Sequence, residues 1–577
     1  MLLASSSTMV AQTVSESVAR QTAAMVFGAV QGQTAKGEHK TAAAKPVLSH
    51  TSQQGDEVYY YAYNNPAGGF VIIGGDEQAK TVLGYCAQGQ FDYARIPANM
   101  KSWLAQYEGQ IHAAKAKALN KTAVKKTAAA PARAEIEPML KTQWGQYSPF
   151  NYAVQGLDKK LGFYPTGCVA TGVAQVLKYL HDKGWDIMGK DYDFEATTTE
   201  DKKDSIVATN TLFDYDWDNM LDVYYNGYKE TQWKAVANLM YRLGRAFNMR
   251  YELTGSSSSL VYAAKGLKAY FNFGRNTCDM HRSTIRNDSV WEQMVYDEMA
   301  RGIPVAYAGN TSAGNGHCFV IDGYTTSITP FSVSEPGFHI NWGYEGDCDG
   351  YFPLTGTVGS GSDERKALTL SGTNYMGYEV VEESYVVGQS MLYGLSVNSD
   401  EPLHVIGYCG GFELSDSEEC TSHGKELTST AGATAYVYTS YETGGLINIS
   451  AENTDITFGL SFTDNATGET TYKMLATAED DFPGDGFIGE ILPFETPSVP
   501  GTYTVRVICK DENGEWQKTR DNEACTLIVT GGTGINTVGL TSSDAASKAG
   551  VRKAIVNNTL VIEKDGNTYN AIGTQIK

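Results

Sequence analysis

A cysteine at the start of a predicted helix is the feature that most constrains how this chain folds. Cys168 follows a turn that ends in Gly167, and valine and leucine side chains then recur at helical spacing as far as Leu180. The first turn of a helix carries unpaired N–H groups and the positive end of the macrodipole, so we expect a thiol pKa below about 8.5. Such a thiol is a candidate nucleophile. A free cysteine is more often a small buried hydrophobe, and other residues must decide between the two roles.

A histidine and an amide lie downstream, where a cysteine nucleophile needs them. His317 stands about 150 residues after Cys168, close to the separation of about 130–150 residues in papain-type peptidases. It opens an apolar run, 318–321, that predicts a buried strand. In a second predicted strand, Asn341 is a candidate to orient the imidazole and Trp342 to cover that contact from water. A core histidine that is bonded only to the backbone is the alternative.

A glutamine upstream of the cysteine supplies a third kind of group. Gln146 follows Trp144 and Gly145, and its side-chain amide can donate a hydrogen bond. Acyl transfer by a thiolate needs donors aimed at the oxygen that becomes negative. We therefore interpret Gln146, together with the N–H of Cys168, as an oxyanion hole. The order glutamine, cysteine, histidine, asparagine is that of papain.

Four sequence blocks resemble the streptopain family, a papain-like group of cysteine peptidases that bacteria secrete. They are 144–146 with 149–151, 166–171 with 174–175, 316–317 with 319–323, and 339–343. The resemblance implies that Cys168 is the nucleophile, that His317 is the general base and acid, and that Gln146 donates to the oxyanion. It also implies that Asn341 and Trp342 fix and shield the histidine.

The chain departs from this family beside the histidine. The family usually has alanine after the histidine and a second Trp-Gly-Gly after Asn-Trp-Gly, whereas this chain has Cys318 and the segment 344–346, Tyr-Glu-Gly. No catalytic group is lost, but we expect a different cleft wall there. By the same resemblance, the serine-rich loop 255–259 lies near the cleft, and the glycine-rich segment 355–362 takes the place of a mobile loop.

The 577 residues predict several domains of an α+β protein, in which a papain-like two-part peptidase follows an α+β pro-domain and precedes β-sandwich domains. The expected boundaries are 1–12 for a candidate remnant of a signal peptide, 13–112 for an inhibitory pro-domain, 113–134 for an Ala/Lys-rich linker that is cleaved on activation, 135–376 for the peptidase, 377–532 for one or two immunoglobulin-like sandwiches, and 533–577 for a sorting-type segment. The last segment resembles the C-terminal domains that Gram-negative bacteria export by the type IX route.

Within these domains the apolar patterns predict individual elements. We expect helices at 15–26, 96–117 and 233–247, pro-domain strands at 58–63 and 69–74, peptidase strands from 303 onward, and sandwich strands at 395–397, 403–408, 456–462 and 502–508.

Several classes of ligand are disfavoured. A net charge of −21 argues against nucleic acid and acidic membranes, and no apolar stretch of about 18 residues predicts a transmembrane segment. The segment 214–219 mimics the start of a calcium loop, but Asn219 and Tyr225 stand where glycine and glutamate are required, so we expect a short strand there. The segment 347–350 is interpreted as a turn. We predict no metal and no cofactor.

The nine cysteines are few and scattered, and no Cys-x-x-Cys occurs. Cys409 with Cys420, and Cys509 with Cys525, are candidates for disulfides in an oxidising compartment, and free buried thiols are the alternative.

The sequence therefore predicts a cysteine endopeptidase, secreted or on the surface of a Gram-negative bacterium and made as a zymogen. Its partners would be protein and peptide substrates and its own pro-domain as an intramolecular inhibitor. Two other classes stay open: a catalytically silent adhesin or binding protein on the same fold, and a Cys-His amidase or acyl transferase. The Trp-Gly-Gln block at 144–146 argues against the second of these.

Overall fold

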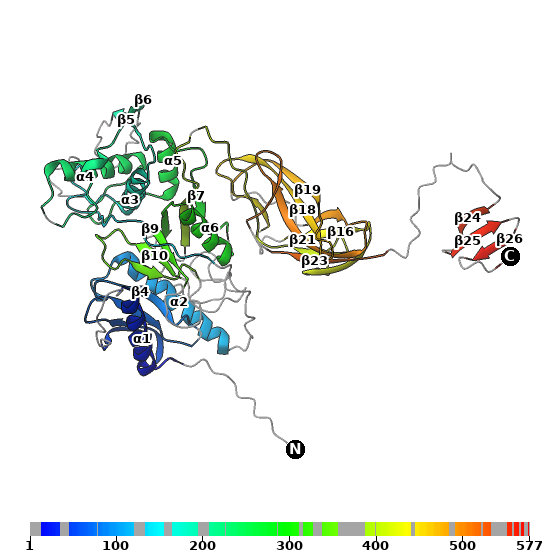
Figure 1. Ribbon diagram of the computed structural model, residues 1–577, viewed down its shortest axis with the longest axis horizontal. Coiled ribbons are helices and arrows are strands. Elements are labelled where there is room, and N and C mark those ends of the chain that lie inside the picture. The colour runs from blue at the N-terminus through cyan, green and yellow to red at the C-terminus, as the bar shows by residue number, and fades with distance from the viewer. Residues whose placement is uncertain are drawn as a thin grey trace, which may run out of the picture.

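The protein is seen in a computed structural model as an N-terminal domain, a central domain and a β-sandwich, followed by a small sheet (Figure 1). The described residues are 13–34, 45–77, 79–119, 133–154, 164–193, 207–225, 227–285, 287–310, 316–326, 337–355, 387–398, 400–439, 445–483, 491–520, 523–531, 551–556, 559–564, 567–570 and 575. The predicted signal remnant at 1–12, most of the linker, and the predicted mobile loop beyond residue 355 lie outside them.

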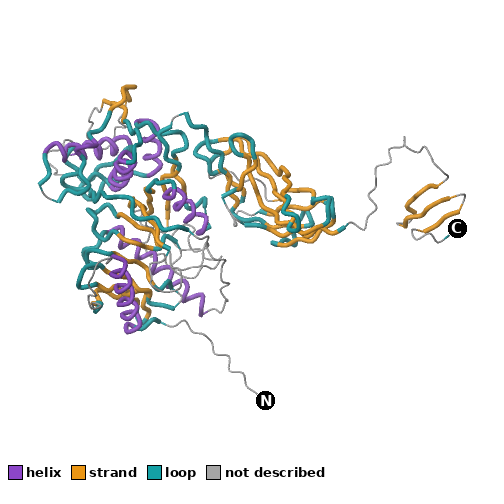
Figure 2. Tube along the Cα trace, in the orientation of Figure 1, coloured by secondary structure: helices purple, strands orange, loops and turns teal. Residues whose placement is uncertain are grey.

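Two helices sandwich an antiparallel meander in the N-terminal domain (Figure 2). Its elements are α1 (Glu16–Thr34), β1 (Val47–Gln54), β2 (Glu57–Asn64), β3 (Phe70–Gly74), β4 (Val82–Cys86) and α2 (Ala98–Leu119). Because side chains alternate along a strand, β2 buries Tyr61 and Tyr63 against α1 and buries Tyr60 and Ala62 with the α2 side chains. The helices and strands predicted for this domain are confirmed.

The sheet of the N-terminal domain continues into the central domain. The strand order is β1-β2-β3-β4-β11-β10-β9-β8-β12-β7, and the two parts join where Tyr85 of β4 pairs with Tyr351 of β11. The central strands are β7 (Cys278–His281), β8 (Val305–Asn310), β9 (Gly316–Thr325), β10 (Gly337–Asn341), β11 (Gly350–Phe352) and β12 (Val387–Tyr393), with α6 (Asp288–Ala300) packed beside β8 and β9. One hydrophobic core therefore spans both domains.

The helical half of the central domain lies on the other side of β9, at the top of Figure 1. It contains α3 (Cys168–Asp182), β5 (Gly189–Asp193), β6 (Val207–Phe213), the 3-10 turn η2 (Trp217–Asn219), α4 (Glu230–Ala246) and α5 (Leu260–Tyr270). Helix α3 is buried almost along its whole length, because small residues let its neighbours approach closely. A Cβ on Gly172 would lie 3.3 Å from the Cys318 Sγ of β9. The predicted helix at 233–247 is confirmed as α4.

Two sequence predictions for the central domain are wrong. The segment 214–219 is not a strand, because residues 214–216 are loop and η2 follows, where the Asn219 side chain donates to both carboxylate oxygens of Asp216. The segment 395–397 is not a sandwich strand, because it is loop and Leu395 is buried in the core of the helical half. Strand β12 pairs with β7 and β8. The central domain thus extends past the predicted boundary at 376/377 to about residue 398.

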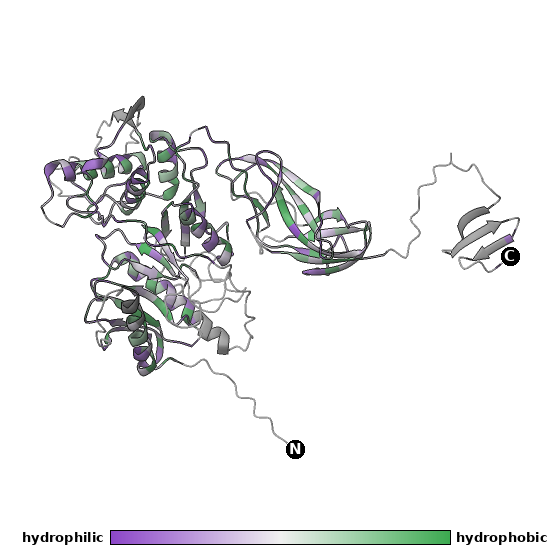
Figure 3. Cartoon of the chain, viewed as in Figure 1, coloured by the Kyte–Doolittle hydropathy of each residue, from purple (hydrophilic) through white to green (hydrophobic). Residues whose placement is uncertain are grey.

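The β-sandwich is one domain whose strands form three sheets around one core. Its strands are β13 (Gly407–Cys409), β14 (Glu413–Ser415), β15 (Glu426–Thr430), β16 (Thr434–Tyr438), β17 (Leu446–Asn448), β18 (Thr454–Asp464), β19 (Thr470–Asp481), β20 (Ile491–Glu495), β21 (Gly501–Lys510), β22 (Trp516–Lys518) and β23 (Cys525–Thr530). The sheets are a pair, β13-β17, a three-stranded sheet, β14-β16-β20, and a six-stranded sheet that contains β15, β18, β19, β21, β22 and β23. Hydrophobic and hydrophilic residues alternate along these strands (Figure 3), as expected for sheets with one buried face. The strands predicted at 456–462 and 502–508 are confirmed as parts of β18 and β21. The strand predicted at 403–408 is wrong over 403–406, which is loop, and β13 begins only at Gly407.

Beyond the sandwich, β24 (Val551–Val556), β25 (Thr559–Lys564) and β26 (Asn567–Asn570) form a three-stranded antiparallel sheet inside the predicted sorting-type segment. All nine cysteines are free, so neither candidate disulfide is formed. No helix in the described part of the chain is long and apolar enough to cross a membrane.

Candidate active site

The predicted nucleophile is the first residue of α3. Gly167 precedes it with φ 87°, a left-handed conformation that favours glycine. A Cβ on Gly167 would lie 2.5 Å from the Met249 Sδ, so there is also no room for a side chain. The Ser256 Oγ donates to the Pro165 carbonyl at 2.7 Å. The predicted serine-rich loop at 255–259 thus holds the turn that presents Cys168.

The environment of Cys168 shifts its acidity in two opposite directions. Burial raises the pKa of the thiol, and hydrogen bonds from backbone N–H groups of Cys318, Val169 and Cys168 itself lower it by less. The net pKa is above the ordinary value, opposite to the sequence prediction. The reason is that burial removes water from the thiol and so disfavours the charged thiolate. This effect on the pKa outweighs the stabilisation of the thiolate by the N–H groups at the helix start.

The predicted general base lies on β9, one residue before the backbone N–H that reaches Cys168. His317 is buried, and its Nε2 lies 3.2 Å from the Trp342 carbonyl oxygen. A carbonyl can only accept, so Nε2 carries the proton and Nδ1 keeps a free lone pair. Burial lowers the pKa of His317 to about 4, so the ring is neutral near pH 7. No hydrogen bond in the described structure joins this ring to the Cys168 thiol.

The amide of Asn341 does not contact His317, which differs from the prediction that it orients the ring. Its Oδ1 accepts from Gln175 Nε2 at 3.1 Å and from the Gly343 N–H at 3.0 Å, and its Nδ2 donates to the Thr142 carbonyl at 3.1 Å. These partners occupy the amide. The neighbouring carbonyl of Trp342 orients the histidine instead.

Gln175 is a functional candidate to which sequence analysis assigned no role. It is fully buried on α3, and its Oε1 accepts from the Thr142 hydroxyl at 3.0 Å, from the Trp144 N–H at 3.2 Å and from Asn341 at 3.3 Å. One amide therefore ties the nucleophile helix to the Gln146 segment and to the end of β10. The available signal was a polar residue at a position where helical spacing predicts burial.

Trp342 is fully buried and holds several partners with its backbone and indole. Its N–H donates to the Asp349 carboxylate at 2.8 Å and its Nε1 to the Cys348 carbonyl at 3.1 Å. Its carbonyl faces His317. The indole thus fixes the backbone that orients the histidine.

Gln146 lies beside the nucleophile's turn. Its carbonyl accepts from the N–H of Thr166 at 2.9 Å, and its side chain is half-buried. This bond brings the glutamine segment next to the start of α3, as an oxyanion donor requires. Its amide makes no hydrogen bond to a described residue.

The N-terminal domain reaches this site through Asn99 of α2. The buried Asn99 Nδ2 donates to the Trp342 carbonyl at 3.1 Å, the same oxygen that His317 uses. Trp103, one turn later, packs edge-on against Trp342 with ring centroids 6.2 Å apart. No local sequence signal marks Asn99, because its contact depends on how two domains dock.

The C-terminal end of the linker is anchored by an arginine. Arg133 lies beside α6, where its Nε donates to Gln293 at 3.0 Å and its Nη1 is 3.4 Å from the Glu292 carboxylate. Among the described residues, no cluster of three or more metal-ligating side chains occurs.

Comparisons with known proteins match both domains separately. Residues 144–352 match the model of the Peptidase C10 family, and residues 11–111 match that of the Spi protease inhibitor. The chain is 28% identical over 421 residues to the thiol protease/hemagglutinin PrtT of Porphyromonas gingivalis, which covers 68% of this chain and 45% of PrtT. It is 30% identical over 315 residues to streptopain of Streptococcus pyogenes, which covers 51% of this chain and 73% of streptopain.

A solved fragment of prointerpain A from Prevotella intermedia is also similar. It shares 28% sequence identity with a TM-score of 0.45, and the match covers 62% of this chain and 100% of the fragment.

Proposed function

Because this chain belongs to the peptidase C10 family, we propose that it is a cysteine endopeptidase made as a zymogen and acting on proteins. The observation that carries the proposal is the meeting of α3 and β9. Gly172 of the helix that begins at Cys168 packs against Cys318, the residue after His317, where an added Cβ would lie 3.3 Å from the Cys318 Sγ. This packing supports a thiol and an imidazole from distant parts of the sequence as the reacting pair.

The chemistry follows from the atoms available there. The Cys168 sulfur attacks the carbonyl carbon of the peptide, while Nδ1 of His317 takes the thiol proton and returns it to the leaving amine. Water then hydrolyses the thioester. The bond from Nε2 to the Trp342 carbonyl supports this role, since it leaves Nδ1 as the basic nitrogen. The Gln146 amide and the N–H of Cys168 are the proposed donors to the oxyanion.

The N-terminal domain is the proposed intramolecular inhibitor. Its sheet joins the peptidase sheet at Tyr85 and Tyr351, and Tyr107 of α2 donates to the Pro353 carbonyl at 2.9 Å. Asn99 engages the carbonyl that orients His317. The missing Cys168–His317 hydrogen bond agrees with a form held inactive. Activation requires cleavage in the linker at 113–134 and separation of β4 from its partner strand β11.

The proposed domains follow the predictions with one change. The pro-domain is 13–112, the linker 113–134, the peptidase 135 to about 398, the sandwich from there to 532, and the sorting-type segment 533–577. The PrtT relative, which comes from a Gram-negative species, and the sorting-type segment support the proposed export to the surface or exterior of a Gram-negative bacterium.

Casein cleavage and active-site labelling test the proposal together. Purified full-length protein should process itself, degrade casein and react at Cys168 with a cysteine-specific epoxide, as shown by mass spectrometry of the labelled peptide. Cys168→Ala should lose all three behaviours, and His317→Gln should lose labelling and cleavage while staying folded. A matched control is Cys318→Ala, which removes the neighbouring buried thiol.

A wild-type protein that stays unlabelled and inactive after the linker has been cut by an added protease would instead favour the silent binding protein. Release of ammonia from glutamine side chains without chain cleavage would favour the acyl transferase.

A further inference from the structure

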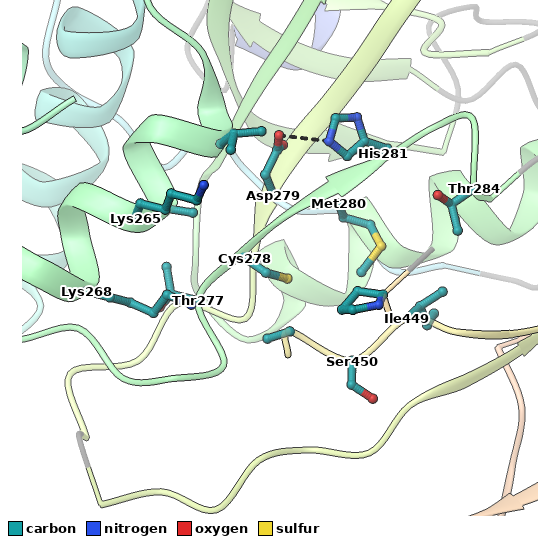
Figure 4. A pocket seen from close by; sticks show the side chains of 14 residues that line it. Lys265, Lys268, Thr277, Cys278, Asp279, Met280, His281, Thr284, Ile449 and Ser450 are labelled. Carbon is teal, nitrogen blue, oxygen red and sulfur yellow. Dashed lines mark ion pairs between the residues drawn. The ribbon is translucent and has the colours of Figure 1, made fainter. Parts of the chain in front are cut away.

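A cavity lies at the seam between the central domain and the β-sandwich (Figure 4). It encloses about 190 Å³, and its walls come from α5, from β7 and the residue before it, and from the sandwich loop at 449–451. This volume is below the range of about 300–1,000 Å³ typical of drug-sized ligands. The site therefore suits a molecule no larger than a single amino acid.

The seam around the cavity is held by specific contacts between the two domains. Arg275 pairs with Glu452 at 2.6 Å, and the Asn276 side chain donates to the Pro402 carbonyl at 2.9 Å. Ile449 of the sandwich is 2% exposed and belongs to the core of the central domain. The cavity is thus framed by packed, hydrogen-bonded walls.

Two buried polar atoms of the lining have no hydrogen-bond partner among the described residues. One is the Thr277 hydroxyl, in a side chain that is 0% exposed. The other is Oδ1 of Asp279, whose side chain is 6% exposed, while its Oδ2 pairs with His281 Nε2 at 3.1 Å. An unmet buried polar group costs about 1–3 kcal/mol, and more when it is charged. A carboxylate oxygen can be satisfied only by a donor.

Positive charge also lines this cavity. Lys265 and Lys268 lie one turn apart on α5, and neither forms an ion pair within the described part of the chain. In Figure 4 both lysines lie to one side of Cys278, and Ile449 and Ser450 lie to the other. A ligand there needs an anionic group for the lysines as well as a donor for Asp279.

Most of the remaining lining is apolar, and Thr284 and Ser450 also border the space. Met280 and Ile449 face the cavity from the two domains, and both are buried in the hydrophobic core. A ligand that fills the space must therefore carry an apolar body between its two charged groups.

We propose that this cavity binds a free apolar α-amino acid. Its ammonium group donates to Asp279 Oδ1, its carboxylate accepts from Lys268 and Lys265, and its side chain lies between Met280 and Ile449. Because the ligand touches both domains, its binding stabilises the docked sandwich. The site is remote from Cys168 chemistry and does not depend on the proposed peptidase activity.

Calorimetric titration of L-leucine into full-length protein tests the site, with Cys168→Ala as background to prevent self-cleavage. We expect saturable 1:1 binding. N-acetyl-L-leucine lacks the ammonium group and L-leucinamide lacks the carboxylate, so each should bind at least tenfold more weakly. Glycine, which lacks the apolar side chain, should also bind at least tenfold more weakly.

Variants of the lining supply the second arm. Asp279→Asn and Lys268→Gln should each weaken leucine binding at least tenfold, since each removes one charge partner. Lys234→Gln, on the exposed face of α4 and outside the cavity, should bind leucine as the parent does. Leucine should raise the thermal midpoint of the parent but not that of Lys268→Gln.

Absence of saturable binding up to the solubility limit of leucine would overturn the proposal. Equal binding of the blocked analogues, or full affinity in both charge variants, would overturn it as well. The analogue series and Lys268→Gln keep the test decisive even when Asp279→Asn does not fold.

Discussion

Replacing the buried amide of Gln175 should damage both stability and catalysis. In Gln175→Leu, the Trp144 N–H and the Thr142 hydroxyl lose the Gln175 Oε1 as their acceptor, and Asn341 loses two of its hydrogen bonds. Each lost neutral bond costs about 1 kcal/mol, and a buried N–H left without a partner costs about 1–3 kcal/mol. Asn341 keeps its bonds to the Thr142 carbonyl and the Gly343 N–H, and burial of the apolar leucine side chain offsets part of the cost of the four lost bonds, so we expect a net loss of about 3 kcal/mol.

Differential scanning calorimetry on the Cys168→Ala background measures this loss in the transition that contains the central domain. At about 2 °C per kcal/mol for a unit of this size, the midpoint should fall by about 6 °C. In the active background, kcat/KM for a peptide substrate should fall at least tenfold, since the segments that carry Gln146 and Trp342 are no longer tied to α3.

Gln106→Leu is the matched control. Gln106 is also buried, but it accepts a longer 3.3 Å hydrogen bond from Gln389 in the N-terminal domain interface. Its substitution should shift the midpoint by less than half as much and leave kcat/KM of the processed enzyme unchanged. A Gln175→Leu protein that melts within 1 °C of its parent, with unchanged kcat/KM, would refute the reasoning.

Three further outcomes follow from the geometry around the site. Asn99→Ala removes one hydrogen bond to Trp342, worth about 1 kcal/mol, so epoxide labelling of Cys168 in the unprocessed chain should speed up about fivefold; an unchanged rate would contradict Asn99's inhibitory role. Burial lowers the pKa of His317 to about 4 from an ordinary value of about 6.5, so the unfolded chain binds a proton that the folded chain lacks between these values. Unfolding free energy should therefore fall by about 3 kcal/mol as pH falls from 6.5 to 4, and denaturant melts of His317→Gln should lack that share. Gly167→Ala should lower the melting midpoint by several degrees and kcat/KM at least tenfold, because the backbone at residue 167 has φ 87° and an added Cβ would clash with Met249. Unchanged kinetics would count against the role of this turn in presenting Cys168.

Local patterns in the sequence were sufficient for the elements that carry the site. The helical spacing of valine and leucine after Cys168 predicted α3, and the continuous apolar run after His317 predicted β9. Both patterns can be read from the sequence because buried segments are built from apolar residues. The misread segments, 214–219, 395–397 and 403–406, are short. In such segments neither periodicity nor length separates a strand from a loop whose side chains are buried by a neighbouring domain.

What the sequence determined by itself was the identity and order of the reacting groups, since their types and neighbours are written in four short blocks. Only the tertiary structure decided the hydrogen-bond partners of these groups and the acidity of the thiol. It turned Asn341 towards Gln175, gave the histidine the Trp342 carbonyl, and raised the pKa of Cys168 by burial. It also joined the N-terminal sheet to the peptidase sheet. Most of these outcomes depend on packing between segments far apart in the sequence, such as those of Gln175 and Asn341, which no local pattern encodes.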